Sequence, residues 1–254
     1  MLYACGPRVK FFVPLLRQPR CGVEDGVVSQ PAEPQPLSVW LRGFFLVYLR
    51  SVDDPLLGII MATHLEAEPF IRATGMTKAT GRPVAVYREA DVVLLVSGIG
   101  KVNAAVAATF CCSTFRPRYI LNLGAAGATT PSHGLGGIYH VAEVIEYDRP
   151  HLRLEGPHVH RPMVLTGFRE ATLATQDRPV IERSHREQVS SVADLVDMEG
   201  SAVVQASRRF EIPCLLFKFV SDTPDEPFGH GDIIDSIRHW SAPFCDYIRN
   251  TVIP

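Results

Sequence analysis

The sequence has no C-x-x-C pair, no excess of basic residues and no uninterrupted apolar run of transmembrane length. Its six cysteines are scattered, so neither a zinc ribbon nor a thioredoxin-type motif is indicated. Twenty-five Lys and Arg residues stand against 27 Asp and Glu residues, which leaves no basic surplus to neutralise nucleic-acid phosphates. The best candidate span, residues 37–52, contains Arg42 and Arg50 and is shorter than the roughly 20 apolar residues needed to cross a bilayer. We therefore expect no nucleic acid and no membrane as partner.

What is present is typical of a globular protein. The chain has 254 residues, of which 46% are hydrophobic and 20% charged. A core of this size needs no metal and no disulfide to be stable. Cys111, Cys112 and Cys214 lie in apolar runs, where buried reduced thiols are expected. Reduced thiols are typical of a cytoplasmic protein.

The chain changes character near residue 54. Residues 1–54 are interrupted by repeated prolines, and residues 30–36 (QPAEPQP) are typical of an extended linker. We expect an irregular, loosely packed extension; the alternative is an accessory strand or helix built on Trp40, Phe44, Phe45 and Tyr48. Residues 55–254 form the second predicted unit, a regular domain.

Short apolar runs alternate with helical patterns throughout the second unit. Runs without polar alternation are typical of strands buried on both faces, and strands that alternate with helices favour a mostly parallel α/β sheet. The predicted strands lie at 57–62, 92–96, 119–123 and 214–220, and helical stripes cover 101–113 and 199–210. Ligands of such sheets bind beyond the carboxyl ends of the strands, where this sequence has Glu66, Glu199, Asp222 and two glycine-rich turns.

Each motif alone has two interpretations. The segment 97–101 (SGIGK) is either a turn that lets a ligand approach the backbone or a plain strand-to-helix connection, and it matches neither a Walker A loop nor a G-x-G-x-x-G fingerprint. The small residues of 122–127 (NLGAAG) indicate close approach of a ligand or of a neighbouring element. Glu199 is either a first-turn helix acid or, with Met198, a ligand of a sugar diol. Asp222 is either a capping residue or a partly buried proton donor.

Together, and in this order, the motifs resemble the nucleoside phosphorylase and nucleosidase superfamily, especially its 5'-methylthioadenosine/S-adenosylhomocysteine nucleosidase branch. Residues 58–60 followed by Glu66 look like the first strand and catalytic Glu turn of that branch. Residues 97–102 match its S-G-I-G-K-V segment. Residues 122–127, 196–199 and 220–222 are similar to N-T-G-S-A-G, V-E-M-E and I-S-D. The likeness runs from about Leu57 to the C-terminus.

The resemblance implies a Rossmann-like three-layer α/β/α sandwich with a mostly parallel mixed sheet. It also implies cleavage of an N-ribosidic bond. Asp222 would protonate purine N7 and recognise the amino group, and Glu66 would activate water, with Glu68 as the alternative. Glu199 and Met198 would hold the ribose. The remaining implied substrate-binding residues are Ser97, Gly98, Ala125, Pro179, Val180 and Ser221. The family has Ser at the position of Ala125 and an aromatic residue at that of Pro179.

This chemistry needs acids and requires neither a metal nor another cofactor. A proton donor at the leaving base and carboxylates beside the sugar and the water follow the two-carboxylate logic of glycoside hydrolysis. The resemblance further implies a homodimer, a small-molecule nucleoside as partner, and a place in methionine salvage. Three alternatives stay open: a phosphorylase acting on a modified adenosyl nucleoside, a futalosine-type hydrolase, and a non-catalytic nucleoside-binding protein. No G-D-P-x-R-A-like phosphate segment follows the first strand, which favours hydrolysis.

Overall fold

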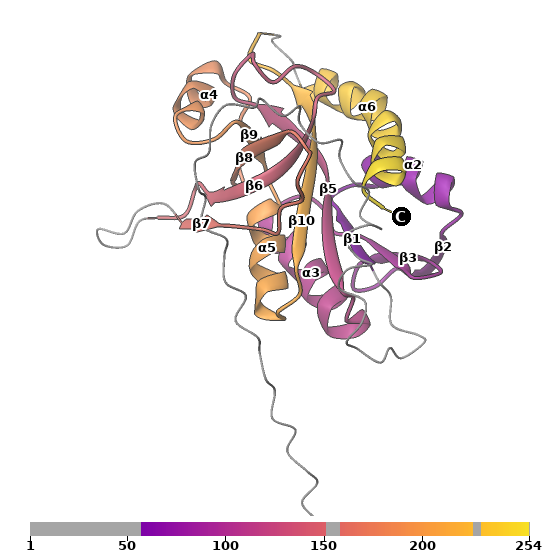
Figure 1. Ribbon diagram of the computed structural model, residues 1–254. Coiled ribbons are helices and arrows are strands. Elements are labelled where there is room, and N and C mark those ends of the chain that lie inside the picture. Colours follow the sequence, from indigo (N-terminus) through magenta and orange to yellow (C-terminus); the bar gives the residue numbers. More distant parts are fainter. Residues whose placement is uncertain (1–56, 151–157, 226–229, 254) are drawn as a thin grey trace, which may run out of the picture. The chain divides into compact units, whose positions relative to one another are not determined.

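A computed structural model of the protein describes residues 57–150, 158–225 and 230–253 (Figure 1). The predicted extension, residues 1–54, lies outside the described residues. The described chain forms an α/β fold with a mixed sheet. The strands are β1 (Leu57–Met61), β2 (Thr77–Thr80), β3 (Ala85–Glu89), β4 (Val92–Val96), β5 (Tyr119–Ala128), β6 (Ile138–Glu146), β7 (His158–His160), β8 (Glu170–Thr175), β9 (Leu195–Asp197) and β10 (Cys214–Asp222). The helices are α2 (His64–Thr74), α3 (Lys101–Phe115), α4 (Arg183–Ser190), α5 (Gly200–Arg209) and α6 (His230–Thr251).

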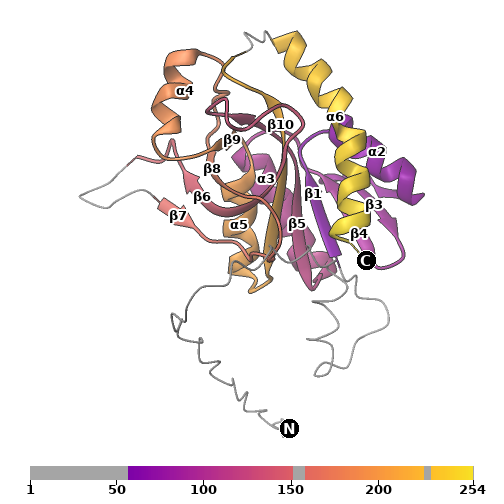
Figure 2. The same ribbon diagram turned by 45° about the horizontal axis from the view of Figure 1, so that its top comes forward.

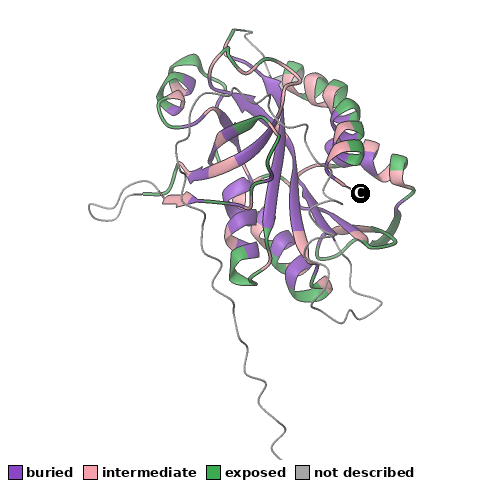
Figure 3. Cartoon of the chain, in the orientation of Figure 1, coloured by how far each residue is buried: buried purple, intermediate pink, exposed green. Residues whose placement is uncertain are grey.

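Helices cover both faces of the sheet, as expected. Helices α3 and α5 pack together on one side, and α2 packs with α6 on the other (Figures 1 and 2). Because side chains alternate between the faces of a strand, Ile60 and Leu95 join the core beneath α3 and α5, whereas Ile59 and Leu94 join the core beneath α2 and α6. The central strands β1, β4, β5 and β10 are almost wholly buried, whereas β2 at the edge of the sheet is mostly exposed (Figure 3).

The expectation of a simple, mostly parallel sandwich is incomplete, because part of the sheet closes on itself. The strands β10, β6, β8, β9 and β5 pair in that order, and β5 also pairs with β10, so these strands form a closed ring. From β5 the sheet continues outward through β1, β4, β3 and β2. The pairings of β5 with β9 and of β6 with β10 are antiparallel. The sheet is thus mixed, with a barrel at one end and an open extension at the other.

The length and composition of β5 explain this closure. Its first half pairs with β1 up to Asn122, and its second half continues past β1 to pair with β9, while β10 pairs with both halves from Ile120 to Gly127. The second half consists of small residues, and Gly124 has a positive φ of 156°. Glycines let a strand bend as it enters a barrel. The residues predicted to allow close approach therefore bend the sheet where its strands end.

Two further expectations concern the buried thiols and the membrane. Cys111, Cys112 and Cys214 are free and buried, as predicted, and burial raises the pKa of the Cys112 thiol to about 11. Such thiols are unreactive at neutral pH. In the described part of the chain, no helix is both long and apolar enough to cross a bilayer.

Candidate active site

A cavity of about 310 Å³ opens beyond the carboxyl ends of β1, β5, β9 and β10. It brings together residues that the sequence places more than a hundred positions apart. The sequence-predicted residues that line it are Glu66, Ala125, Pro179, Val180, Met198, Glu199, Ser221 and Asp222. Two other predicted substrate-binding residues, Ser97 and Gly98, do not line the cavity. The predicted convergence of three acids at one edge is therefore present.

Glu66 occupies one side of the cavity and begins α2. Its Oε2 accepts hydrogen bonds from the backbone N–H of Thr63 at 2.9 Å and from the Thr63 hydroxyl at 2.7 Å. Glu66 and Thr63 thereby form a capping box at the start of the helix. Its Oε1 accepts from the backbone N–H of Ala125 at 2.9 Å. Three donors occupy three of the roughly four lone-pair sites of a carboxylate, so about one remains for a ligand or water.

Glu68, the alternative to Glu66, lies on the surface of α2. Its side chain is 63% exposed and faces Arg72, one turn along the helix. It does not line the cavity. Of the two glutamates, only Glu66 is placed to contact a ligand there.

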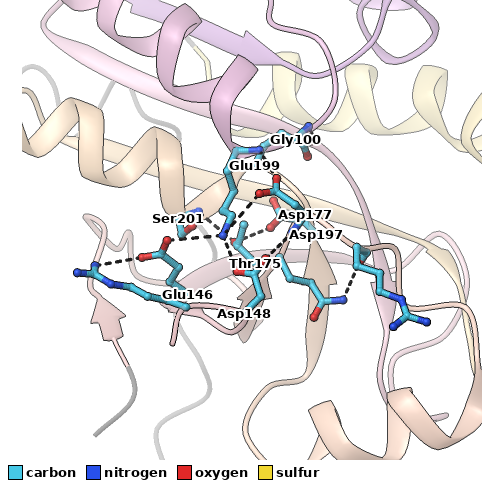
Figure 4. Close-up of polar contacts among 12 residues, drawn as sticks. Gly100, Glu146, Asp148, Thr175, Asp177, Asp197, Glu199 and Ser201 are labelled. Atoms are coloured by element: carbon cyan, nitrogen blue, oxygen red, sulfur yellow. Dashed lines mark hydrogen bonds and ion pairs between the residues drawn. The ribbon is translucent and has the colours of Figure 1, made fainter. Parts of the chain in front are cut away.

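Glu199 lies at the start of α5 and is 7% exposed. Its Oε1 accepts a hydrogen bond of 2.8 Å from the backbone N–H of Gly100 (Figure 4). Burial raises the pKa of the Glu199 carboxyl to about 7, and the neighbouring Asp197 carboxylate adds to this rise, whereas the Lys218 ammonium opposes it. A carboxyl group with a pKa near 7 changes its charge in the neutral pH range.

Lys218 and Asp197 belong to the site and were missed by the sequence analysis. The Lys218 Nζ lies 2.9 Å from Asp197 Oδ2. Burial alone would lower the pKa of the lysine, but the carboxylates of Asp197, Glu199 and Glu66 outweigh it and raise the pKa. The sequence did contain a signal, because a lysine in the middle of the most apolar strand has to find a buried anion.

Asp197 is in turn fixed by the elements on either side of it. It accepts hydrogen bonds from the Thr175 hydroxyl at 2.6 Å and from the backbone N–H of Gly200 at 2.8 Å (Figure 4). Thr175 also accepts from the backbone N–H of Ser201. These bonds connect β8, β9 and the first turn of α5, and they hold the main chain on both sides of Glu199.

Asp222, the last residue of β10, also lines the cavity. One carboxylate oxygen, Oδ1, accepts a 2.6 Å hydrogen bond from the Ser221 hydroxyl. The other, Oδ2, accepts from the guanidinium of Arg186, a buried residue of α4. Arg186 carries no sequence motif and was not expected at the site. Asp222 is therefore an ion-paired residue in the ligand-free protein.

Ser97 and Gly98 build the turn that leads into α3. The backbone N–H groups of Ser97 and Gly98 donate to the carbonyls of Met61 and Ala62, each at 2.9 Å. The Ser97 hydroxyl donates to backbone carbonyls, and Gly98 adopts a positive φ of 89° that favours glycine. The turn thereby brings Ile99 into the cavity wall and aims the Gly100 N–H at Glu199.

Lys101 ties the same turn to the segment that forms another wall of the cavity. Its ammonium lies 2.5 Å from Asp148, 3.6 Å from Glu146 and 3.7 Å from Asp177 (Figure 4). Its backbone N–H donates to Asp177 at 2.8 Å. Asp177 immediately precedes the lining residues 178–181, so this cluster holds the start of that wall against α3.

The rest of the lining is mostly apolar, with Arg178 as its one cation among the described residues. Pro179, Val180 and Ile181 contribute from the connection between β8 and α4, and Ile233, Ile234 and Ile237 contribute from α6. A cavity with acids at two ends and an apolar wall suits a ligand with a polar sugar, a flat base and an apolar substituent. In the described ranges, no group of three or more His, Cys, Asp or Glu side chains could hold a metal ion.

The sequence is similar to those of known proteins. The family model of the Phosphorylase superfamily matches residues 57–170 and 163–252. A 5'-methylthioadenosine/S-adenosylhomocysteine nucleosidase from Bacillus velezensis is 30% identical over 161 residues, which cover 54% of this chain and 70% of that protein. A protein of the same name from Bacillus subtilis is 29% identical over the same shares of both chains.

Solved structures with low sequence identity share the fold. A futalosine hydrolase mutant from Helicobacter pylori superposes with a TM-score of 0.69 at 16% identity, covering 77% of this chain and 97% of that one. The 5'-methylthioadenosine nucleosidase of Arabidopsis thaliana in its apo form also gives a TM-score of 0.69, at 19% identity, covering 80% of this chain and 95% of that one.

Proposed function

The chain belongs to the phosphorylase superfamily, and from that premise we propose that it hydrolyses the N-ribosidic bond of a purine nucleoside of the 5'-methylthioadenosine or S-adenosylhomocysteine type. One observation carries the proposal: Glu66, Glu199 and Asp222 line a single cavity at the carboxyl ends of the strands. Cleavage of this bond develops positive charge on the sugar and negative charge on the base, and these acids flank the two places where such charge arises.

At the base end, Asp222 takes up a proton from water as the substrate binds, and gives it to purine N7 while the electron pair of the C–N bond passes to the leaving base. Pro179 and Val180 flank the base through their backbone and side chains, and Ser221 orients the Asp222 carboxyl group. Ala125 lies between the base end and Glu66. Its backbone N–H donates a hydrogen bond to Oε1 of Glu66. The neutral base then leaves with the proton on N7.

At the sugar end, Glu199 accepts hydrogen bonds from the ribose hydroxyls and Met198 packs against the ring. A water molecule bound to the remaining lone pair of Glu66 attacks C1' and transfers its proton to that carboxylate. Lys218 balances the negative charge of Asp197 and holds this residue in place through their ion pair. Ser97 and Gly98 act on the substrate indirectly, through the turn that aims Gly100 N–H at Glu199.

Hydrolysis is favoured over phosphorolysis by the charge of the sugar end. Phosphate binding usually needs unopposed cations or a helix N-terminus. Here the Lys218 ammonium is bound to Asp197, and the N–H of Gly100 at the start of α3 already donates to the Glu199 carboxylate. A phosphate dianion would meet three acids at the place where it has to attack C1'.

We also propose a homodimer. Ile99, Val102 and Val106 form an exposed apolar stripe along α3, with exposed fractions of 56%, 74% and 47%. Ile99 also lines the cavity, so a second copy packed on this stripe would lie beside the site. Sedimentation should give the mass of a dimer for the protein and that of a monomer for Val102→Glu. A native protein that sediments as a monomer would refute this proposal.

The free buried thiols support a cytoplasmic location, where the nucleoside products of methionine metabolism are salvaged. Cys111, Cys112, Cys214 and Cys245 are all free in the described part of the chain. Cell fractionation of the tagged protein tests this location, which a periplasmic or secreted signal would contradict.

The test of the proposed function is release of free base from a panel of nucleosides, with and without phosphate. We expect adenine from 5'-methylthioadenosine and from S-adenosylhomocysteine at equal rates in both buffers. Release that requires phosphate, together with a ribose 1-phosphate product, would establish the phosphorylase alternative. Release of hypoxanthine from inosine or futalosine in preference to adenine would change the substrate. Binding without release of base would indicate a nucleoside-binding protein.

A further inference from the structure

We propose that Arg186 is the residue that makes the site specific for 6-aminopurines, because it holds one oxygen of Asp222 as a permanent hydrogen-bond acceptor. The inference rests on the proposed function, since it assigns the base that Asp222 reads. It concerns a residue outside every motif of the chain, on a helix that otherwise looks like a surface helix.

Helix α4 is polar except on its inner side. Among its residues, Arg186 and Val189 are buried, and the other side chains are exposed or partly exposed. Val189 packs in a small core with Val180, a lining residue of the cavity. A buried arginine on this inner side has to find acceptors within the protein, because burying an unpaired guanidinium is costly.

The guanidinium bridges two strands. One terminal nitrogen, Nη1, donates to the backbone carbonyl of Ala128 at 2.6 Å, and the other, Nη2, donates to Asp222 Oδ2. Ala128 ends β5 and Asp222 ends β10. This fork uses the planar, two-pronged geometry that distinguishes arginine from lysine. Arg186 therefore fixes both the position of Asp222 and which of its oxygens faces a cation.

The two oxygens of Asp222 thus have different partners. Oδ2 lies against a cation and keeps its lone pairs, because a proton there would have to compete with the guanidinium. Among the described residues, Oδ1 has only the Ser221 hydroxyl, whose single hydrogen has an alternative acceptor in the carbonyl of Ala126 at 3.3 Å. When Oδ1 is protonated, the Ser221 hydrogen can turn to Ala126. Oδ1 is therefore the oxygen able to carry the proton that passes to purine N7.

Room for a base atom beside Oδ2 comes from Gly127. This glycine lines the cavity, and a Cβ at its position would lie 2.8 Å from Oδ2. Arg186 itself does not line the cavity, so it acts from behind the carboxylate and not by contact with the ligand. Arg186 is accordingly a positioning residue.

A ligand meets a donor at Oδ1 and a fixed acceptor at Oδ2. A 6-aminopurine satisfies both, because N7 accepts the proton and the exocyclic amino group donates to Oδ2. A 6-oxopurine presents oxygen to Oδ2, which leaves two acceptors facing each other without a hydrogen. Sites built to bind a donor strongly reject analogues that lack it. Without Arg186, the proton of Asp222 can occupy either oxygen, and the site no longer distinguishes a 6-aminopurine from a 6-oxopurine.

The experiment compares 5'-methylthioadenosine with 5'-methylthioinosine, which share their sugar and differ in the 6-substituent. We expect the native protein to prefer the amino compound, and Arg186→Met to lower the ratio of kcat/KM values by about tenfold or more. Arg186→Lys, which keeps the cation, should retain most of the preference. Arg183→Met is the matched control, since Arg183 lies on the exposed side of the same helix. A folded Arg186→Met protein with the native ratio would overturn the inference.

Binding of the free bases makes the inference testable apart from catalysis. Calorimetry should show adenine bound more tightly than hypoxanthine by the native protein, and Arg186→Met should reduce that ratio about tenfold. If the native protein releases base from neither nucleoside, the hydrolase proposal fails, while the ratio of base affinities still decides the role of Arg186. If Arg186→Met does not fold, Arg186→Gln supplies a neutral residue that can still donate to Ala128. An unchanged base preference in that variant would equally refute the inference.

Discussion

The Lys218 ammonium lies 2.9 Å from Asp197 Oδ2, with both side chains almost entirely buried, at 2% and 1% exposure. This ion pair lies beneath the proposed sugar end of the cavity and holds Asp197 in the lining. Lys218 also faces Glu199 and Glu66, so one buried cation stands among three carboxylates. Isolated buried charges are strongly disfavoured, and the pair persists because each member offsets the desolvation of the other.

Replacing Lys218 with Met should destabilise the protein by about 3–5 kcal/mol, the usual consequence of removing one partner of a buried ion pair. Methionine fills a similar volume, so the decrease in stability measures the loss of the charge and not the creation of a cavity. The free energy of unfolding in urea measures it. Lys78→Met, at an exposed position of β2, is the control and should change stability by about 0.5 kcal/mol or less. A Lys218→Met protein as stable as the control would show that the three acids need no compensating cation.

Glu199→Gln should stabilise the protein above pH 7 and leave it unchanged near pH 4.5. Burial raises the pKa of Glu199 from the ordinary 4.5 to about 7, so the folded protein keeps a proton that the unfolded chain has lost. Stability therefore falls as pH rises from 4.5 to 7, and the full cost of the buried charge remains above that range. Glutamine removes this cost, on the order of 1–3 kcal/mol. Melting temperatures at pH 5 and pH 8 measure the effect, and an equal difference at both pH values would contradict it.

The features predicted from the sequence are those that depend on local pattern. Apolar runs identified β1, β4 and β10 because these strands are buried on both faces. The position of an acid after a strand placed Glu66 and Asp222 at one edge, since the carboxyl ends of neighbouring parallel strands meet there. These inferences need only the strand and the residue that follows it.

The features that were missed depend on long-range contact. The ring closes because β9, a strand of three residues, pairs with both β5 and β8, and no local pattern specifies these two partners. Arg186 and Arg183 lie one turn apart on a polar helix, and no local pattern distinguishes the buried one from the exposed one. The lysine of β10 was visible in the sequence, but its partner Asp197 comes from a different strand. Only the packing of α4 against the ring and the pairing of β9 within it determine these partners.

Asp222→Asn should fold normally and lose about three orders of magnitude in turnover. Asparagine keeps an oxygen for the Arg186 guanidinium, so the wall of the cavity stays intact, but it has no proton to give to N7. General acid catalysis typically contributes about 10²–10⁴-fold. The rate of base release from 5'-methylthioadenosine measures the loss. Asp225→Asn, an exposed neighbour along the chain, should keep the native rate. Near-native turnover by a well-folded Asp222→Asn protein would remove Asp222 from the mechanism.

Glu66→Gln should reduce turnover by about 10²–10⁴-fold for ribosides and 2'-deoxyribosides alike. The variant loses the base that accepts the proton of the attacking water, and that step does not involve the 2' hydroxyl. Helix α2 should persist, because glutamine also serves in a capping box. Glu68→Gln, on the exposed side of the same helix, is the control and should leave the rates unchanged. Equal rates for native and Glu66→Gln proteins would exclude Glu66 as the base.

Glu199→Gln should act differently, by weakening the preference for ribosides over 2'-deoxyribosides. A carboxylate accepts from both ribose hydroxyls, and its hydrogen bond to the 2' hydroxyl is the one that a deoxyriboside lacks. A hydrogen bond to a charged group contributes about 1.5–3 kcal/mol, so the ratio of kcat/KM values for the two substrates should fall roughly ten- to a hundredfold. The bond from Gly100 N–H to Oε1 can persist with glutamine, which keeps the turn before α3 in place. The assay must be run above pH 7, where the native Glu199 is ionised. If the ratio stayed at its native value while the protein remained folded, Glu199 would be only the acid at the first turn of α5, and the ribose would have to be held by another residue.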